Sequence, residues 1–293
     1  MKRGIASLTA FLMALLFCIL LAGEAYAEGQ APVAQNLELK TYRNTSVGGR
    51  LSAYDPDRDV VSFEITTKPV KGDLKLLEDG SFIYTPRRNK KGRDYFGYRA
   101  KDAEGHVSQE ATAQIRIEQR SKAMRYQDTE GRAGDYAAAA LMEQGVFIGE
   151  QLGGKLYFSP DRPVTRGEFL RMAMQIAGTP LMRTVMLSPF EDDAAMDEGT
   201  RAVAATAAIA GLVETGGRFE AEKGISLAEA ARILSAALKL EDAAVPDGEH
   251  DLQACFNLMA AGILDEAARE EELLTREQAA IMLVRAAETI AGR

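Results

Sequence analysis

Three aspartates at alternating positions, Asp55, Asp57 and Asp59, are the residues best placed for metal chemistry. Carboxylates with this spacing can converge on Ca²⁺, which binds six to eight oxygen ligands, and Asp102 could approach from a neighbouring loop. The alternative is a polar turn, because aspartate and the intervening Pro56 favour turns in their own right. The stretch lacks the glycine and the distal bidentate glutamate of an EF-hand loop. The turn is therefore the favoured interpretation, and Ca²⁺ is the one cofactor that the sequence suggests.

A second group of candidates stands at three predicted helix starts, Thr165–Glu168, Ser226–Glu229 and Thr275–Gln278. Each has the pattern of a capping box, in which the Ser or Thr side chain accepts a backbone N–H and the Glu or Gln side chain reaches back to the cap residue. An Ala-rich or Met-rich apolar helical pattern follows each start. Three such starts at one period indicate an internal repeat.

Two of these starts carry an arginine at the first helical position, Arg166 and Arg276, where the third has Leu227. A cation there costs about 0.3–1 kcal/mol unless an anion is near, because the helix N-terminus carries positive partial charge. An arginine beside free N–H groups is a ready anion site, and a carboxylated sugar fits it. The alternative is an exposed arginine paired with a local acid such as Asp161 or Glu277.

The remaining reactive residues do not form a catalytic arrangement. Cys255 lies in an apolar helical pattern and is predicted to be a buried small hydrophobe; a nucleophile would need an activating base, and His250 falls just outside that pattern. The acidic runs Glu191–Asp193 and Glu270–Glu272 are predicted to be solvated faces or loops rather than acid–base pairs. The sequence contains no Gly-rich phosphate loop, paired His ligands or Ser-His-Asp spacing. We expect no enzymatic activity.

The composition argues against several classes of partner. The chain of 293 residues has a formal net charge of −8 and a pI of about 5.1. DNA, RNA and anionic lipid require basic surfaces, so none of them is expected as a bulk partner.

The N-terminal segment is predicted to be a secretory signal peptide. Lys2 and Arg3 precede an apolar stretch from Ala6 to Ala22, and Ala25–Ala27 forms a small-x-small cleavage site. An uncleaved membrane anchor is the alternative, although the apolar stretch is somewhat short for a stable span. Cys18 lacks the small preceding residue of a lipoprotein site, so we expect cleavage after residue 27 and no lipid.

The first half of the mature chain is predicted to be an Ig-like antiparallel β-sandwich, because short β-rich or alternating stretches follow one another closely. Asp79-Gly80 between two of them is a strong hairpin signal. The predicted strands are 47–54, 61–67, 74–77, 81–85, 95–100 and 111–117.

Four stretches, 31–34, 49–59, 79–86 and 94–98, resemble bacterial cadherin-like Ig repeats. The resemblance covers residues 31–118, because the turns and the Tyr-Thr-Pro ending come in the order typical of that family. It implies a sandwich, and it slightly favours Ca²⁺ at the alternating aspartates.

The second half, residues 126–293, resembles S-layer homology domains. Each predicted capping box is preceded by a helix that ends at a glycine, Gly145, Gly211 or Gly262. The resemblance implies three helix–loop–helix repeats around a pseudo-threefold axis that bind secondary cell-wall polysaccharide, often through a pyruvate ketal carboxylate. The sequence departs from the family at 132–134, where Arg-Ala-Gly replaces His-Trp-Ala, and in its degenerate second and third copies. The glycan-binding residues that it implies are Thr165, Arg166, Glu168, Thr275 and Arg276.

The sequence therefore predicts a multidomain β + α protein. Residues 1–27 are the signal peptide, 28–120 the sandwich, and 121–185, 186–245 and 246–293 the three repeats of an all-α bundle. We expect a secreted protein of the bacterial cell wall or surface, anchored non-covalently to an anionic polysaccharide or peptidoglycan-linked glycan. The alternative is a secreted adhesin or carbohydrate-binding module with purely structural repeats. The Ig-like module would bind a further protein or glycan partner, and no membrane span is expected after cleavage.

Overall fold

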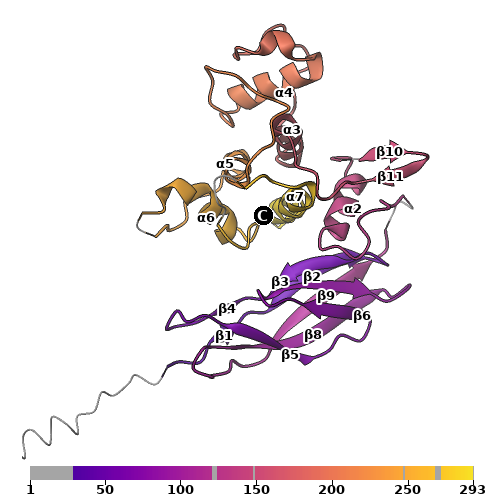
Figure 1. Cartoon of the computed structure of the whole chain (residues 1–293), viewed down its shortest axis with the longest axis vertical. Helices are drawn as coiled ribbons and strands as arrows, with labels where there is room; N and C mark the ends of the chain where they lie inside the picture. The colour runs from indigo at the N-terminus through magenta and orange to yellow at the C-terminus, as the bar shows by residue number, and fades with distance from the viewer. Residues whose placement is uncertain (1–28, 121–123, 148, 247, 268–271, 293) are drawn as a thin grey trace, which may run out of the picture.

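The computed structural model describes residues 29–120, 124–147, 149–246, 248–267 and 272–292. The expected signal peptide lies outside these residues. β-sheets formed by residues 33–118 lie below a group of helices formed by the rest of the chain (Figure 1). Within the described ranges, no helix combines the length and the apolar character needed to cross a bilayer.

Two β-sheets form the N-terminal region. The strand order is β2-β9-β8-β5 in one sheet and β3-β7-β6 in the other, while β1 and β4 pair separately. The strands are β1 Val33–Ala34, β2 Leu37–Tyr42, β3 Val47–Arg50, β4 Ala53–Tyr54, β5 Ser62–Thr67, β6 Gly72–Leu76, β7 Ser81–Pro86, β8 Gly92–Lys101 and β9 Ala111–Glu118.

Alternating burial along the strands builds one core between the sheets. Every second residue of β9 is buried while most of its neighbours are exposed, as expected for a strand with one face against a core. The hairpin predicted at Asp79-Gly80 is confirmed, since Gly80 joins β6 to β7 with a φ of +81°. The fully buried aromatic residues at the centre are Phe82, Tyr84, Phe96 and Tyr98.

The prediction of an antiparallel sandwich is wrong at one edge. Strand β2 runs parallel to β9, with Leu37 opposite Ala113 and Thr41 opposite Ile117. Strands β1 and β2 themselves are not among the strands that the sequence predicts. Alternation of apolar residues shows which face of a strand is buried but not the direction of its neighbour. Strand β2 pairs with the last strand, so their relative direction depends on the path of the whole sandwich.

Six α-helices and one short β-hairpin follow in the described residues. Gly145, Gly211 and Gly262 follow the ends of α2, α4 and α6, as predicted. Their φ angles are +70°, +69° and +71°, in the left-handed region that favours glycine at a helix end. The elements are α2 Asp135–Glu143, β10 Glu150–Leu152, β11 Lys155–Tyr157, α3 Arg166–Ile176, η1 Asp193–Ala195, α4 Glu198–Ile209, α5 Leu227–Leu238, η2 His250–Leu252, α6 Gln253–Ala260 and α7 Arg276–Ala291.

The helix pairs α2–α3, α4–α5 and α6–α7 close into a ring. Helix α4 packs on α3, α6 on α5, and α2 on α7, so each first helix lies against the second helix of the preceding pair. At the centre, Val164 N–H donates to Leu274 O, Leu274 N–H to Ile225 O, and Ile225 N–H to Val164 O, at 2.9, 2.9 and 3.0 Å. All three residues are buried. This cyclic arrangement gives the ring an approximate threefold axis.

The β-sandwich docks on helix α2. The Gly48 N–H donates to Ala133 O at 2.9 Å, and the Tyr136 N–H donates to Ser46 O at 2.9 Å. The Ser46 N–H in turn donates to the carboxylate of Asp135 at 3.0 Å. These bonds join strand β3 and the residue before it to the start of α2, so the sandwich and the helical ring share a defined interface.

Candidate ligand-binding grooves between the helical repeats

The predicted capping boxes form at two of the three helix starts. Thr165 Oγ1 accepts from Glu168 N–H at 3.3 Å, and the Glu168 carboxylate accepts from Thr165 N–H at 3.1 Å. Thr275–Gln278 repeats this reciprocal pair. Ser226 accepts from Glu229 N–H at 3.2 Å, but the Glu229 carboxylate turns instead toward Arg166. The third box is therefore only half formed.

The expected free N–H groups at these helix starts are not free. Each starting segment pairs with a neighbouring repeat: the first two amides of α3 and of α7, and the first amide of α5, donate to backbone carbonyls there. The prediction that free helix amides contribute to an anion site is therefore wrong. Of the groups that were predicted to bind an anion, only the guanidinium groups remain. The bonds are Arg166 N to Lys223 O, Gly167 N to Ala221 O, Arg276 N to Arg162 O and Glu277 N to Pro160 O, at 2.8–3.0 Å.

Arg166 lies in an open groove between the first and second helix pairs. Its guanidinium stands over the Phe219 ring, 5.6 Å from the centroid, and its Nε lies 3.0 Å from Glu229 Oε1 without a well-aligned hydrogen bond. Among the described residues this guanidinium is ion-paired with Glu229 alone, and neither of its Nη atoms donates a hydrogen bond. The groove has a volume of about 500 Å³ and is also lined by Arg232 and Ile233. Both Nη groups of Arg166 are thus left without a hydrogen-bond acceptor beside this groove.

Arg276 occupies the corresponding position between the third and first pairs, but its surroundings are closed. The side chain is 5% exposed, and the adjacent cavity measures only about 10 Å³. Nη1 donates to Glu150 at 3.0 Å and to Phe158 O at 3.1 Å, while Nη2 donates to Glu168 at 3.3 Å. The hydrogen bond and charge of Arg276 hold the pKa of Glu150 below its usual value. Arg276 therefore links two repeats and has no open side for a large ligand.

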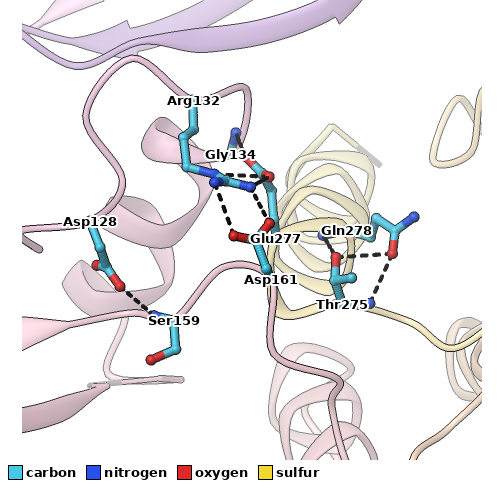
Figure 2. Close-up of polar contacts among 8 residues, drawn as sticks. All are labelled: Asp128, Arg132, Gly134, Ser159, Asp161, Thr275, Glu277 and Gln278. Carbon is cyan, nitrogen blue, oxygen red and sulfur yellow. Dashed lines mark hydrogen bonds and ion pairs between the residues drawn. The ribbon is translucent and has the colours of Figure 1, made fainter.

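The local acids proposed as partners of these arginines bind Arg132 instead (Figure 2). Arg132 Nη2 lies 2.5 Å from Asp161 Oδ1 and 2.7 Å from Glu277 Oε2. The other Glu277 oxygen accepts from Gly134 N–H at 2.8 Å. Gly134 is the N-cap of α2 and has no side chain to cap it, so a carboxylate from α7 takes that role. In the sequence Arg132 stands out only as a departure from a family pattern, and no local signal indicates this network.

An aspartate fixes the loop before α3 and the loop before α5 in the same way. Asp128 accepts from Phe158 and Ser159 N–H, and Asp192 accepts from Phe219 and Glu220 N–H, at 2.7–2.9 Å. Burial alone would raise the pKa of Asp192, but the hydrogen bonds from these two amides outweigh it and leave the pKa below its usual value. One member of the predicted acidic run 191–193 is thus a loop anchor. The run 270–272 lies mostly outside the described residues.

The aromatic residues of these two loops also correspond. The rings of Tyr126 and Phe158 lie 5.2 Å apart at 53°, and those of Phe190 and Phe219 lie 5.1 Å apart at 49°. Matching ring pairs and matching aspartates show that the first two helix pairs are copies of one unit. Cys255, in the third pair, is 2% exposed within the core, which confirms the prediction of a buried small hydrophobe.

The alternating aspartates form a turn. Asp55 Oδ1 accepts from the backbone N–H of Asp57 at 2.9 Å and of Asp59 at 3.2 Å, while Asp57 accepts from Gln30 N–H. Asp102 accepts from the backbone of its own loop. In the described part of the chain, no three acidic, histidine or cysteine side chains gather closely enough to hold a metal ion. The geometry favours the turn interpretation, and Ca²⁺ binding stays a prediction.

The fold and these grooves define a two-part protein: an Ig-like β-sandwich joined to a ring of three helix pairs. Residues 29–119 match the family model described as the bacterial cadherin-like domain, so the sandwich is a domain of that type. This match ends before the helical ring begins. No curated protein matches the sequence.

Three solved structures illustrate the more distant similarities. A putative alpha-galactosidase from Bacteroides fragilis is 19% identical over 30% of this chain and 18% of its own, with a TM-score of 0.25. The sialic acid binding region of a Streptococcus sanguinis adhesin is 14% identical over 31% and 30%, also at 0.25. The SrpA adhesin of Streptococcus sanguinis is 16% identical over 33% and 65%, again at 0.25. The chain spans less than a fifth of the first of these, and TM-scores this low do not establish a shared fold.

Proposed function

We propose that this chain is a secreted bacterial surface protein that holds the cell wall non-covalently through its helical ring and displays the cadherin-like domain. The ligand is an anionic wall polysaccharide, such as one that carries a pyruvate ketal. This function requires binding and no catalysis. The resemblance of residues 126–293 to S-layer homology domains and the leading segment 1–27 support it.

The observation that carries this proposal is that neither Nη group of Arg166 has a hydrogen-bond acceptor among the described residues. A carboxylate binds both Nη atoms of an arginine in a bidentate manner, and such charge-assisted bonds are stronger than neutral ones. The groove of about 500 Å³ around Arg166 is large enough for one or two sugar units. Arg232, which is exposed in the same groove, adds a second cation for a further acidic group, in a lining that also holds the carboxylates of Glu214 and Glu229.

Thr165 and Glu168 act on this site by fixing the start of α3, from which Arg166 projects. They contact each other rather than the groove, so they position the arginine. Thr275 has the same effect at the start of α7, where Arg276 is closed off. Of the two arginines, the proposal therefore assigns the polysaccharide to the site of Arg166.

A pull-down on purified, protein-free cell walls tests the proposal. Arg166→Ala should weaken wall binding about tenfold to a hundredfold, since a hydrogen bond to a charged group contributes about 1.5–3 kcal/mol. Arg232→Ala should weaken it less. Arg171→Ala is the matched control, because Arg171 lies on the same helix α3 but is exposed outside the groove. Unchanged binding by a folded Arg166→Ala/Arg232→Ala protein would contradict the proposal.

The second candidate is a secreted adhesin or carbohydrate-binding module whose helical ring is structural only. The closed surroundings of Arg276 favour it, because one of the two arginines holds repeats together instead of facing a groove. Cell fractionation separates the two candidates. The wall-anchoring protein sediments with the wall pellet, whereas the structural alternative places the protein in the culture medium.

A further inference from the structure

A cavity of about 370 Å³ lies between the β-sandwich and the helical ring. One wall is the outer face of the sheet formed by β2, β9 and β8, and the other is formed by α2 and α7. The hydrogen bonds of Ser46 and Gly48 to the start of α2 close one side. The ion pair of Lys40 with Glu288, at 3.9 Å, bridges the two walls. The cavity is distinct from the Arg166 groove and shares no lining residue with it.

Three cations stand in one row across the sheet wall. In the strand register, Lys40 on β2 is opposite Arg116 on β9, and Arg116 is opposite Arg93 on β8. Neighbouring strands lie about 4.8 Å apart, so the row spans roughly 10 Å. Arg285 adds a fourth cation from α7, and the described residues of the lining include only two carboxylates, those of Glu38 and Glu288. The residues of the lining are therefore net positive in a protein whose formal charge is −8, although Arg285 is also ion-paired with Asp265 at 2.9 Å.

The two arginines of this row, Arg93 and Arg116, have no evident structural purpose. Like charges directly opposite each other on neighbouring strands destabilise a sheet. Arg93 has no hydrogen-bond or ion-pair partner among the described residues, and Arg116 is paired only with the exposed Glu118, at 3.2 Å. An arginine pair that weakens its own sheet and faces a cavity is better explained by a ligand than by the fold.

Apart from Arg285 and Glu288, the side chains of α2 and α7 that line the opposite wall are apolar or aromatic. Tyr136 and Ala137 of α2 and Ile281 and Val284 of α7 face the cavity. Apolar and aromatic surface suits the uncharged faces of a sugar ring, and the cation row suits acidic groups spaced along a chain.

We propose that this cavity binds a short acidic saccharide, with at least two negative groups about 5–10 Å apart lying along the row of Lys40, Arg116 and Arg93. The groups are carboxylates or phosphates, which arginine and lysine bind by the same charge-assisted bonds. The ligand would sit between the two domains and stabilise their docking, because it contacts both walls.

Isothermal titration calorimetry on the full-length secreted chain at low ionic strength tests this inference. The probes are digalacturonate for carboxylates, glucose 1,6-bisphosphate for phosphates and cellobiose as the neutral control. We expect one of the two oligoanions to bind with unit stoichiometry, weakened by added salt, and cellobiose not to bind. The stronger oligoanion identifies the acidic group.

Charge-neutralising variants locate the site. Arg93→Gln and Arg116→Gln should each weaken the oligoanion about tenfold or more, and both should fold at least as stably as the parent because a like-charge pair is relieved. Arg99→Gln is the matched control, since Arg99 lies on the same face of β8 beyond the cavity. Arg166→Ala should leave this binding unchanged, which separates it from wall anchoring. Absence of binding by both oligoanions, or binding unaffected by the Arg93→Gln/Arg116→Gln pair, would overturn the inference.

Discussion

At the scale of single residues, two arginines in one sequence context have different surroundings. Arg166 and Arg276 both follow a capping threonine, yet Arg276 meets acids from the β10–β11 hairpin and from α3, while Arg166 meets Glu229 alone among the described residues. The groove that stays open is the one where the guanidinium keeps unpaired donors. The number of guanidinium donors left without an acceptor thus depends on how many acids the neighbouring repeat supplies.

Glu277 gives a residue-scale prediction. It holds Arg132 and caps the amide of Gly134, and its side chain is 18% exposed. Glu277→Ala should lower the free energy of unfolding by about 1.5–3 kcal/mol, because hydrogen bonds to a charged group are lost. Asp161→Ala removes the other acid of Arg132 but from a side chain that is 79% exposed, so its cost should stay within about 0–1 kcal/mol. Urea unfolding measures both; equal losses would show that the α2 cap contributes nothing.

At the scale of elements, the helices of the ring have the same starts and stops. Ser or Thr caps α3, α5 and α7, and Gly145, Gly211 and Gly262 stop α2, α4 and α6 in the left-handed conformation. These signals act within a few residues, which is why degenerate copies keep them. The three copies therefore agree at the positions that set backbone direction and differ at the first helical position, where the second copy has Leu227 in place of an arginine.

Gly211 tests the helix stop. Its φ is +69°, and no atom lies within 4 Å of the position that an added Cβ would take, so a substitution meets only backbone strain. Gly211→Ala should cost about 1–2 kcal/mol, and Gly211→Asn less, because asparagine tolerates this conformation better. Gly217→Ala is the control: it is equally uncrowded but not at positive φ, and its cost should be under about 1 kcal/mol. Chemical denaturation in which Gly211→Ala matches the control would refute the strain argument.

At the scale of the whole molecule, the two parts are joined at the start of α2. Asp135 accepts from Ser46 N–H of the sandwich and from Thr129 Oγ1 of the ring, at 3.0 and 2.7 Å. Arg120 and Glu143 form a further ion pair there at 3.2 Å, with side chains only 11% and 13% exposed. The Tyr42 and Tyr136 rings pack 5.2 Å apart across the interface. Docking therefore combines polar and aromatic contacts.

The raised pKa of Asp135, at the interface between the sandwich and the ring, predicts how stability depends on pH. Burial raises its pKa, against the hydrogen bonds from Thr129 and Ser46. The Asp135 carboxyl group therefore binds its proton more tightly in the folded state than in the unfolded chain. Protonation of Asp135 thus stabilises the folded state at low pH, and this stabilisation is lost as the pH rises through the raised pKa. Relative to the parent, Asp135→Asn should gain melting temperature at pH 7 and lose that advantage near pH 4.

Asp197→Asn is the control for this pH series, with the opposite sign. Asp197 caps α4, and the hydrogen bonds from Thr200 lower its pKa. Its contribution is present above the unfolded pKa and lost in acid, so Asp197→Asn should be the less stable protein at pH 7 and match the parent at low pH. Melting curves at both pH values decide the matter. A parent-to-variant difference for Asp135→Asn that does not change with pH would contradict the prediction.

The sequence by itself determined the features that depend on nearby residues. The strand regions from Val47 onward, the Asp79-Gly80 hairpin, two full capping boxes and the glycine stops all follow from interactions between residues a few positions apart. Each is a choice of backbone conformation, which neighbouring side chains are sufficient to bias.

Only the tertiary structure decided what happens between distant segments. It paired β2 in parallel with β9, bonded the helix-start amides to neighbouring repeats, closed Arg276 against Glu150, which is 126 positions away, and placed the cation row against α2 and α7. The physical reason is that burial and pairing depend on which surfaces meet. A local pattern shows that a side chain is charged or a strand is one-sided, but not what the rest of the chain brings to face it.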